Sequence, residues 1–76
     1  HAKVFIQTGA FTDYQNALKQ VSTLQAKFAA QLQEASVQGK TFYRVRIGPM
    51  ADVASADTTL KNVVEAGFKD ARLVIE

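Results

Sequence analysis

The sequence repeats its own pattern after 39 residues, and this recurrence limits the folds open to the chain. Three features recur at that shift: Gly9 and Gly48, Asp13 and Asp52, and Ala17 and Ala56. Apolar positions recur as well: Val4 and Tyr43, Ile6 and Val45, Val21 and Leu60, and Leu24 and Val63. Each half therefore reads as a strand, a glycine turn, an acidic cap and an amphipathic helix. The identities are few, so either a duplication or recurring turn-and-cap chemistry explains them, and both predict two β-α-β halves.

The first half begins with a predicted strand over residues 3–8, which are rich in β-branched and aromatic side chains and end at Gly9. Thr12 and Gln15 have the spacing of a capping box, which places Asp13 in the first turn of a helix. The apolar stripe of that helix is Tyr14, Leu18, Val21, Leu24, Phe28 and Leu32. The spacing thus predicts a helix that continues to about residue 32.

The second half begins with a short strand predicted over residues 34–38 and a hairpin turn over residues 38–40. Residues 41–47 form the clearest predicted strand, and Gly48-Pro49 is expected to break its ladder. Asp52 is predicted to cap a second helix that stops at Gly67, and residues 71–75 are the last predicted strand. The stripe of the second helix is Ala56, Leu60, Val63 and Val64.

This β-α-β-β-α-β order predicts an α+β fold of the ferredoxin-like class. Right-handed crossovers place both helices on one face of a four-stranded antiparallel sheet, and the other face stays bare. With 76 residues, the chain is predicted to be one domain over residues 1–76. His1-Ala2 at its start is interpreted as a remnant of a tag or a proteolytic cut.

Composition removes several classes of enzyme. Cysteine is absent and the single histidine is His1, so thiol nucleophiles, histidine acid–base pairs and clustered metal ligands are not expected. Asp13, Glu34, Asp52 and Asp57 are interpreted as caps and solvated charges, so we expect no catalytic residue, metal or cofactor. The net charge is +2, and no apolar run approaches the roughly 18 residues of a membrane span, so no membrane contact is expected.

Strand alternation then sorts the side chains of the predicted sheet into two faces. Tyr43, Val45 and Ile47, with Val4 and Ile6, are predicted to face the helices. The bare face is predicted to carry Lys3, Phe5, Gln7, Phe42, Arg44 and Arg46. In the last strand Leu73 and Val74 have opposite parity, and alternation alone does not say which one faces the core.

Aromatic rings, guanidinium groups and an amide on one surface fit several partners. Rings stack on flat or apolar faces, arginines bind carboxylate or phosphate, and glutamine bonds amides or hydroxyls. Single-stranded RNA and acidic amino-sugar polymers both match, while a protein contact such as a dimer interface, or no role at all, stays open. The predicted third strand lacks the signature of RNA-binding domains of this fold, and the charge is modest for a phosphate binder.

Two segments resemble a known family: Phe5-Ile6-Gln7-Thr8-Gly9-Ala10-Phe11 and Tyr43-Arg44-Val45-Arg46-Ile47-Gly48-Pro49. Together they resemble the SPOR domain, and the resemblance extends over residues 3–75. It implies non-catalytic binding of peptidoglycan glycan strands that have lost their stem peptides, and hence a periplasmic location at the division septum. It also implies a parent protein that is an outer-membrane lipoprotein with a separate lytic transglycosylase domain. We expect the domain itself to be a monomer without a nucleic-acid partner.

The resemblance also assigns residues to the glycan. Gln7 matches the glutamine on the binding face of the family, beside Gly9, while Ala10 stands where a small polar residue is common. Phe42 stands where tryptophan is common, and Arg44 follows two places on. We expect Arg44 and Arg46 to bind the lactyl carboxylate that peptide removal frees, Phe42 and Phe5 to contact sugar rings, and Gln7 to bond acetamido groups.

Overall fold

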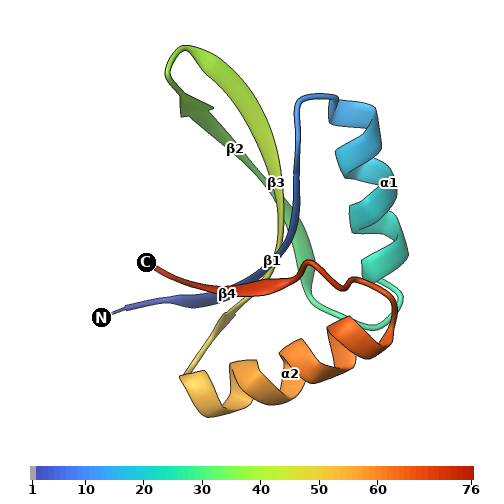
Figure 1. The fold of residues 1–76 in the computed structure, drawn as a ribbon, viewed down its shortest axis with the longest axis vertical. Helices are drawn as coiled ribbons and strands as arrows, with labels where there is room; N and C mark the ends of the chain where they lie inside the picture. Colours follow the sequence, from blue (N-terminus) through green and yellow to red (C-terminus); the bar gives the residue numbers. More distant parts are fainter. Residues whose placement is uncertain (1) are drawn as a thin grey trace.

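The computed structural model describes residues 2–76; His1, interpreted above as a tag remnant, lies outside them. The elements along the chain are β1 (Val4–Phe11), α1 (Tyr14–Leu24), β2 (Ala30–Val37), β3 (Lys40–Met50), α2 (Val53–Glu65) and β4 (Arg72–Ile75). The four strands form one antiparallel sheet in the order β2-β3-β1-β4. Both helices pack on the same face of this sheet (Figure 1). The predicted α+β, ferredoxin-like fold is confirmed.

The core lies between the helices and the two central strands. Ile6, Val45 and Ile47 are completely buried beneath Leu24 of α1 and Val63 of α2. Tyr43 packs on the same side, edge-to-face against Tyr14 with ring centroids 5.3 Å apart. Leu73 packs against this core, which answers the question of parity in β4: Val74 faces the other side of the sheet. The side of the sheet without helices is called the open face from here on.

The helix caps confirm one prediction and correct another. Asp52 caps α2, and its carboxylate accepts a hydrogen bond from the backbone N–H of Ser55 at 2.7 Å. At α1 the cap is Asp13 and not Thr12, because the Asp13 carboxylate accepts the backbone N–H of Gln15 at 2.8 Å. A carboxylate is a stronger acceptor than a hydroxyl, and its charge also complements the helix dipole.

The predicted end of the first helix is wrong. The helix stops at Leu24, eight residues before Leu32, and Leu32 instead lies in β2 opposite Val45. The side-chain amide of Gln25 donates to the Ala30 carbonyl at 3.1 Å and holds the returning chain. Phe28 and Leu32 still pack against the core, so a helical spacing of apolar residues was produced by a turn followed by a strand.

The ladder also continues through Gly48-Pro49, where the sequence predicted a break. Val4 pairs with Met50 and Ile6 with Ile47, so Gly48 and Pro49 lie together in a bulge opposite Phe5. A bulge leaves residues outside the ladder, and the missing N–H of proline is tolerated there. The predicted hairpin turn is confirmed: Gln38 and Gly39 both have positive φ, at 50° and 78°, as a tight two-residue turn requires.

The end of α2 is as predicted at Gly67. The N–H groups of Gly67 and Phe68 donate to the carbonyls of Val64 and Val63, and Gly67 has a φ of 111°. This is the Schellman arrangement, in which glycine takes the left-handed position without a steric penalty. Of the predicted stripe, Ala56 and Val63 are buried, whereas Val64 is exposed.

Candidate functional site

The register of the sheet determines which side chains share the open face. Arg46 of β3 lies opposite Gln7 of β1, and Arg44 lies opposite Ala10. Directly opposed residues project to the same side of a sheet, so all four belong to one surface. The predicted first strand ended at Gly9, before Ala10, whereas Ala10 lies within β1. Thr8 is the extra residue of a bulge there, and this bulge brings Ala10 back to the open face.

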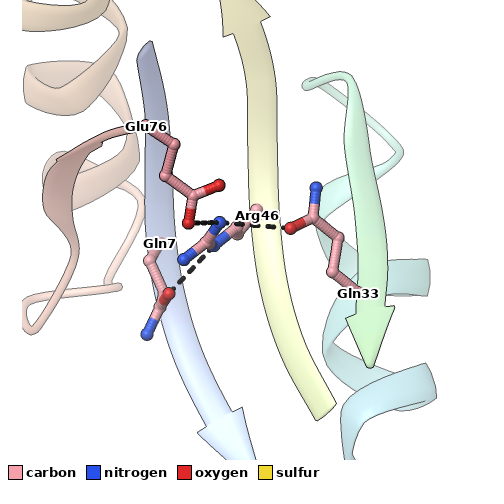
Figure 2. Close-up of polar contacts among 4 residues, drawn as sticks. All are labelled: Gln7, Gln33, Arg46 and Glu76. Carbon is pink, nitrogen blue, oxygen red and sulfur yellow. Dashed lines mark hydrogen bonds and ion pairs between the residues drawn. The ribbon is translucent and has the colours of Figure 1, made fainter. Parts of the chain in front are cut away.

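Arg46 connects all four strands on this face. Its Nε donates to Gln7 Oε1 of β1 at 3.0 Å, and its Nη1 donates to Gln33 Oε1 of β2 at 3.1 Å (Figure 2). Nη1 also bonds Glu76 Oε2 at 2.8 Å, just after β4. Glu76 is held there because its backbone N–H and carbonyl both pair with Lys3.

The predicted exposure of Phe5, Gln7 and Arg46 is therefore wrong, although their face was predicted correctly. Arg46 is 3% exposed, Phe5 5% and Gln7 8%. The Arg46 guanidinium lies 5.5 Å from the centroid of the Phe5 ring, a cation–π distance. Phe5 is covered because its ring packs against that group and close to the backbone of Gly48. The Phe5 ring is thus covered, and the Arg46 charge is paired with Glu76.

Two other arginines, Arg44 and Arg72, lie on this face. Arg44 is partly exposed and Arg72 is exposed, and within residues 2–76 neither takes part in an ion pair. Arg72 of β4 lies opposite Gln7 of β1, so the guanidinium groups of Arg44 and Arg72 come from the strands on either side of β1. Arg72 was not identified from the sequence, because the parity of its strand was not resolved. The pairing of Arg72 with Gln7 across the sheet identifies it as a residue of this face.

A cleft opens beside these residues. β4 pairs only with residues 4–7 of β1, so the second half of β1 has no strand on that side. The resulting cleft has a volume of about 440 Å³. Its lining consists of Gln7, Thr8, Gly9, Ala10, Phe11, Gln20, Asp70 and Arg72. Three predicted site residues, Gln7, Gly9 and Ala10, thus line one hollow together with Arg72.

Gly9 serves the close approach of α1. A Cβ at this position would lie 3.0 Å from Gln20 Oε1 and from the Phe11 ring. Its neighbour Thr8 donates its hydroxyl to the same Gln20 oxygen at 2.7 Å, which fixes the bulge against the helix. Gly9 therefore shapes the wall of the cleft without offering a side chain.

Phe42 lies farther along β3, opposite Ala35 of β2, and is partly exposed. In Figure 1 this end of the β2–β3 hairpin leans away from α1. We define the open-face patch as Phe42, Arg44, Ala10, Gln7, Gln33 and Arg72; Gln33, like Arg72, was not identified from the sequence.

The described part of the chain holds little else that suggests chemistry. Among residues 2–76, no three histidine, cysteine or acidic side chains lie close enough together to hold a metal ion. Neither helix there has the length and apolarity to span a bilayer. The open-face patch offers donors, cations and one ring, which suits recognition of an oxygen-rich ligand.

Comparison with known proteins finds solved structures with the same fold. The SPOR domain of RlpA from Pseudomonas aeruginosa superposes with a TM-score of 0.81 at 20% identity, over 93% of this chain and 96% of that one. The peptidoglycan binding domain of the B. subtilis cell wall lytic enzyme CwlC superposes with a TM-score of 0.78 at 30% identity, over 100% and 91%. No curated protein sequence matches significantly. The sequence profile of the SPOR domain matches residues 1–73, and the chain therefore belongs to the SPOR domain family.

Proposed function

We propose that this chain binds peptidoglycan through the open-face patch, and that it prefers glycan strands without stem peptides. The observation that carries the proposal is that Arg44 and Arg72, which have no ion-pair partner among residues 2–76, lie on either side of Gln7 and Ala10. The family and the similarity to a peptidoglycan binding domain at 30% identity support the ligand class.

The chemistry of a stripped strand fits these groups. Removing the stem peptide from N-acetylmuramic acid leaves a free lactyl carboxylate, which a guanidinium binds by charge-assisted hydrogen bonds. We assign this carboxylate to Arg44 and Arg72. Arg46 is a poor candidate, because Glu76 already supplies it with a carboxylate at 2.8 Å. Phe42 offers its ring to the apolar face of a sugar.

Selection against intact peptidoglycan is in part steric. Because the side chain of Ala10 is small, the sugar chain lies close to the sheet in the middle of the patch. A stem peptide attached to it collides there with the flanking arginines. Each exposed ion pair contributes at most about 1 kcal/mol, so the affinity of one domain is moderate and builds up along a polymer.

The role is one of targeting and not of catalysis. In this proposal the domain is a periplasmic monomer that brings a parent protein to the division septum, where stripped strands accumulate. Any lytic activity belongs to another part of that parent.

The direct test is retention on sacculi. We expect wild-type protein to be retained on amidase-treated sacculi and much less on untreated ones. Arg44→Ala should reduce retention about fivefold, which corresponds to the loss of about 1 kcal/mol. Lys61→Ala on exposed α2 is the control with the same loss of charge and should bind as wild type. Equal retention on both sacculi contradicts the preference for stripped strands, and unchanged binding by Arg44→Ala contradicts the assigned face.

A further inference from the structure

Arg46 is buried at the centre of a binding face and yet has no room to act as a main ligand contact. Its three hydrogen bonds reach side chains from β1, from β2 and from the residue after β4. Arginine has five N–H donors and no acceptor, so every group that bonds it must present an oxygen. This property determines the orientation of the two glutamine amides beside it.

Gln7 and Gln33 both turn the carbonyl end of the amide toward Arg46. Gln7 Oε1 accepts from Nε at 3.0 Å, and Gln33 Oε1 accepts from Nη1 at 3.1 Å. The opposite orientation would bring N–H groups against N–H groups, which no protonation state of arginine relieves. The amide nitrogens are consequently directed away from the guanidinium, as Figure 2 shows.

Those nitrogens have no partner in the described part of the chain. Neither Gln7 Nε2 nor Gln33 Nε2 makes a hydrogen bond within residues 2–76. In the same part of the chain, no buried side-chain nitrogen or oxygen lacks a partner, so both nitrogens reach the surface. Gln31 provides a contrast on the same face: its Nε2 already donates to the Gly48 carbonyl at 3.2 Å.

We infer that Arg46 is a positioning residue that orients Gln7 and Gln33 as two outward-facing hydrogen-bond donors. The open face then selects glycan groups that accept hydrogen bonds, with the acetamido carbonyl oxygens of the sugars as the matching class. This inference rests on the proposed function, and it adds Gln33 to the residues that contact the ligand.

The test uses Gln7→Glu and Gln33→Glu, which preserve shape and keep an oxygen toward Arg46 but remove the donor. We expect each variant to bind stripped glycan oligosaccharides at least about tenfold more weakly. The hydrogen bond from the amide nitrogen is lost, and a carboxylate oxygen then faces the acceptor oxygen of the glycan. Their melting temperatures should equal or exceed that of wild type, because a carboxylate strengthens the bond to Arg46. Gln31→Glu adds the same charge to the same face and should change affinity less than about threefold.

A second measurement follows the amides themselves. In wild type, the side-chain amide NMR signals of Gln7 and Gln33 should shift when the oligosaccharide is added. In Arg46→Met these signals should move toward the values of mobile glutamines even without ligand, while the backbone signals of core residues such as Ile6 stay in place. Unchanged amide signals in Arg46→Met, or wild-type affinity in Gln7→Glu and Gln33→Glu, overturn the inference. Absence of binding by wild type itself contradicts the proposed function instead.

Discussion

Arg44 and Arg46 are two residues apart on one face of one strand, and they have opposite environments. Arg46 is enclosed by Phe5, Gln7, Gln33 and Glu76, so its charge is neutralised inside the protein. Arg44 lies opposite Ala10 of β1 and Gln33 of β2, neither of which is charged, and keeps its charge for a partner. Alternation along a strand assigns both to the same face but says nothing of burial, which depends on neighbours from other strands.

The same limit explains the residues that were missed. Gln33 belongs to a strand whose first part was predicted as helix, and Arg72 to a strand too short and too mixed to assign by parity. Their place in the patch depends on the pairing of β2 with β3 and of β4 with β1, which no local pattern contains. Gln7 and Phe42, by contrast, were assigned to their face correctly from alternation alone.

Acid sensitivity can be tested at a single residue. The backbone N–H of Ser55, and next its hydroxyl, bond the Asp52 carboxylate and hold its pKa below the ordinary 3.8. A pKa that is lower in the folded than in the unfolded chain stabilises the fold above the unfolded value, and this contribution is lost as the pH falls through the folded value. Melting temperature should therefore fall below about pH 4 in part through this cap.

Asp52→Asn separates the cap from the charge, because asparagine also accepts the capping bond but does not titrate there. The variant should lose less melting temperature than wild type between pH 7 and pH 3. Asp57→Asn is the control, because it removes a carboxylate of the same helix that accepts no hydrogen bond within residues 2–76. This variant should lose as much melting temperature as wild type between pH 7 and pH 3. An Asp52→Asn variant with the full wild-type acid loss contradicts this account of the cap.

At the scale of the elements, two bulges shape the open face. One, at Thr8, brings Ala10 opposite Arg44, and the other accommodates Gly48-Pro49 opposite Phe5. The predicted order of strands and helices is confirmed, but neither bulge was predicted, because a bulge is a relation between two strands. The prediction that the first helix continues past Leu24 was wrong for a related reason. Apolar residues also recur at spacings of three and four where a turn leads into a strand.

The second bulge can be tested through its glycine. A Cβ at Gly48 would lie 3.0 Å from the Val4 carbonyl oxygen, and the residue has a φ of 127°. Gly48→Ala therefore combines backbone strain with a clash against main chain and should reduce the free energy of unfolding by about 3 kcal/mol or more. Chemical denaturation measures this loss. Gly39→Ala is the control, because nothing lies within 4 Å of a Cβ at Gly39.

Gly39→Ala adds only the strain of positive φ, at about 1–2 kcal/mol. Equal losses in the two variants would mean that the contact between Gly48 and Val4 does not constrain the bulge.

At the scale of the whole molecule, the sheet has one face under helices and one face open (Figure 1). The 39-residue recurrence relates Gln7 to Arg46, and the structure places these two residues opposite each other at the centre of the sheet. The two halves of the chain thus meet in the hydrogen bond that organises the open face. In this account the helices supply stability, and the open face supplies recognition.

The central claim is that stripped glycan lies on the open face, and NMR mapping tests it most directly. Oligosaccharides from amidase-treated sacculi are added to labelled protein, and backbone and side-chain signals are followed. The account predicts shifts concentrated at Phe42, Arg44, Ala10, Gln7, Gln33 and Arg72, with the exposed sides of α1 and α2 unaffected. Shifts concentrated on the helices, with the open-face patch silent, would contradict it.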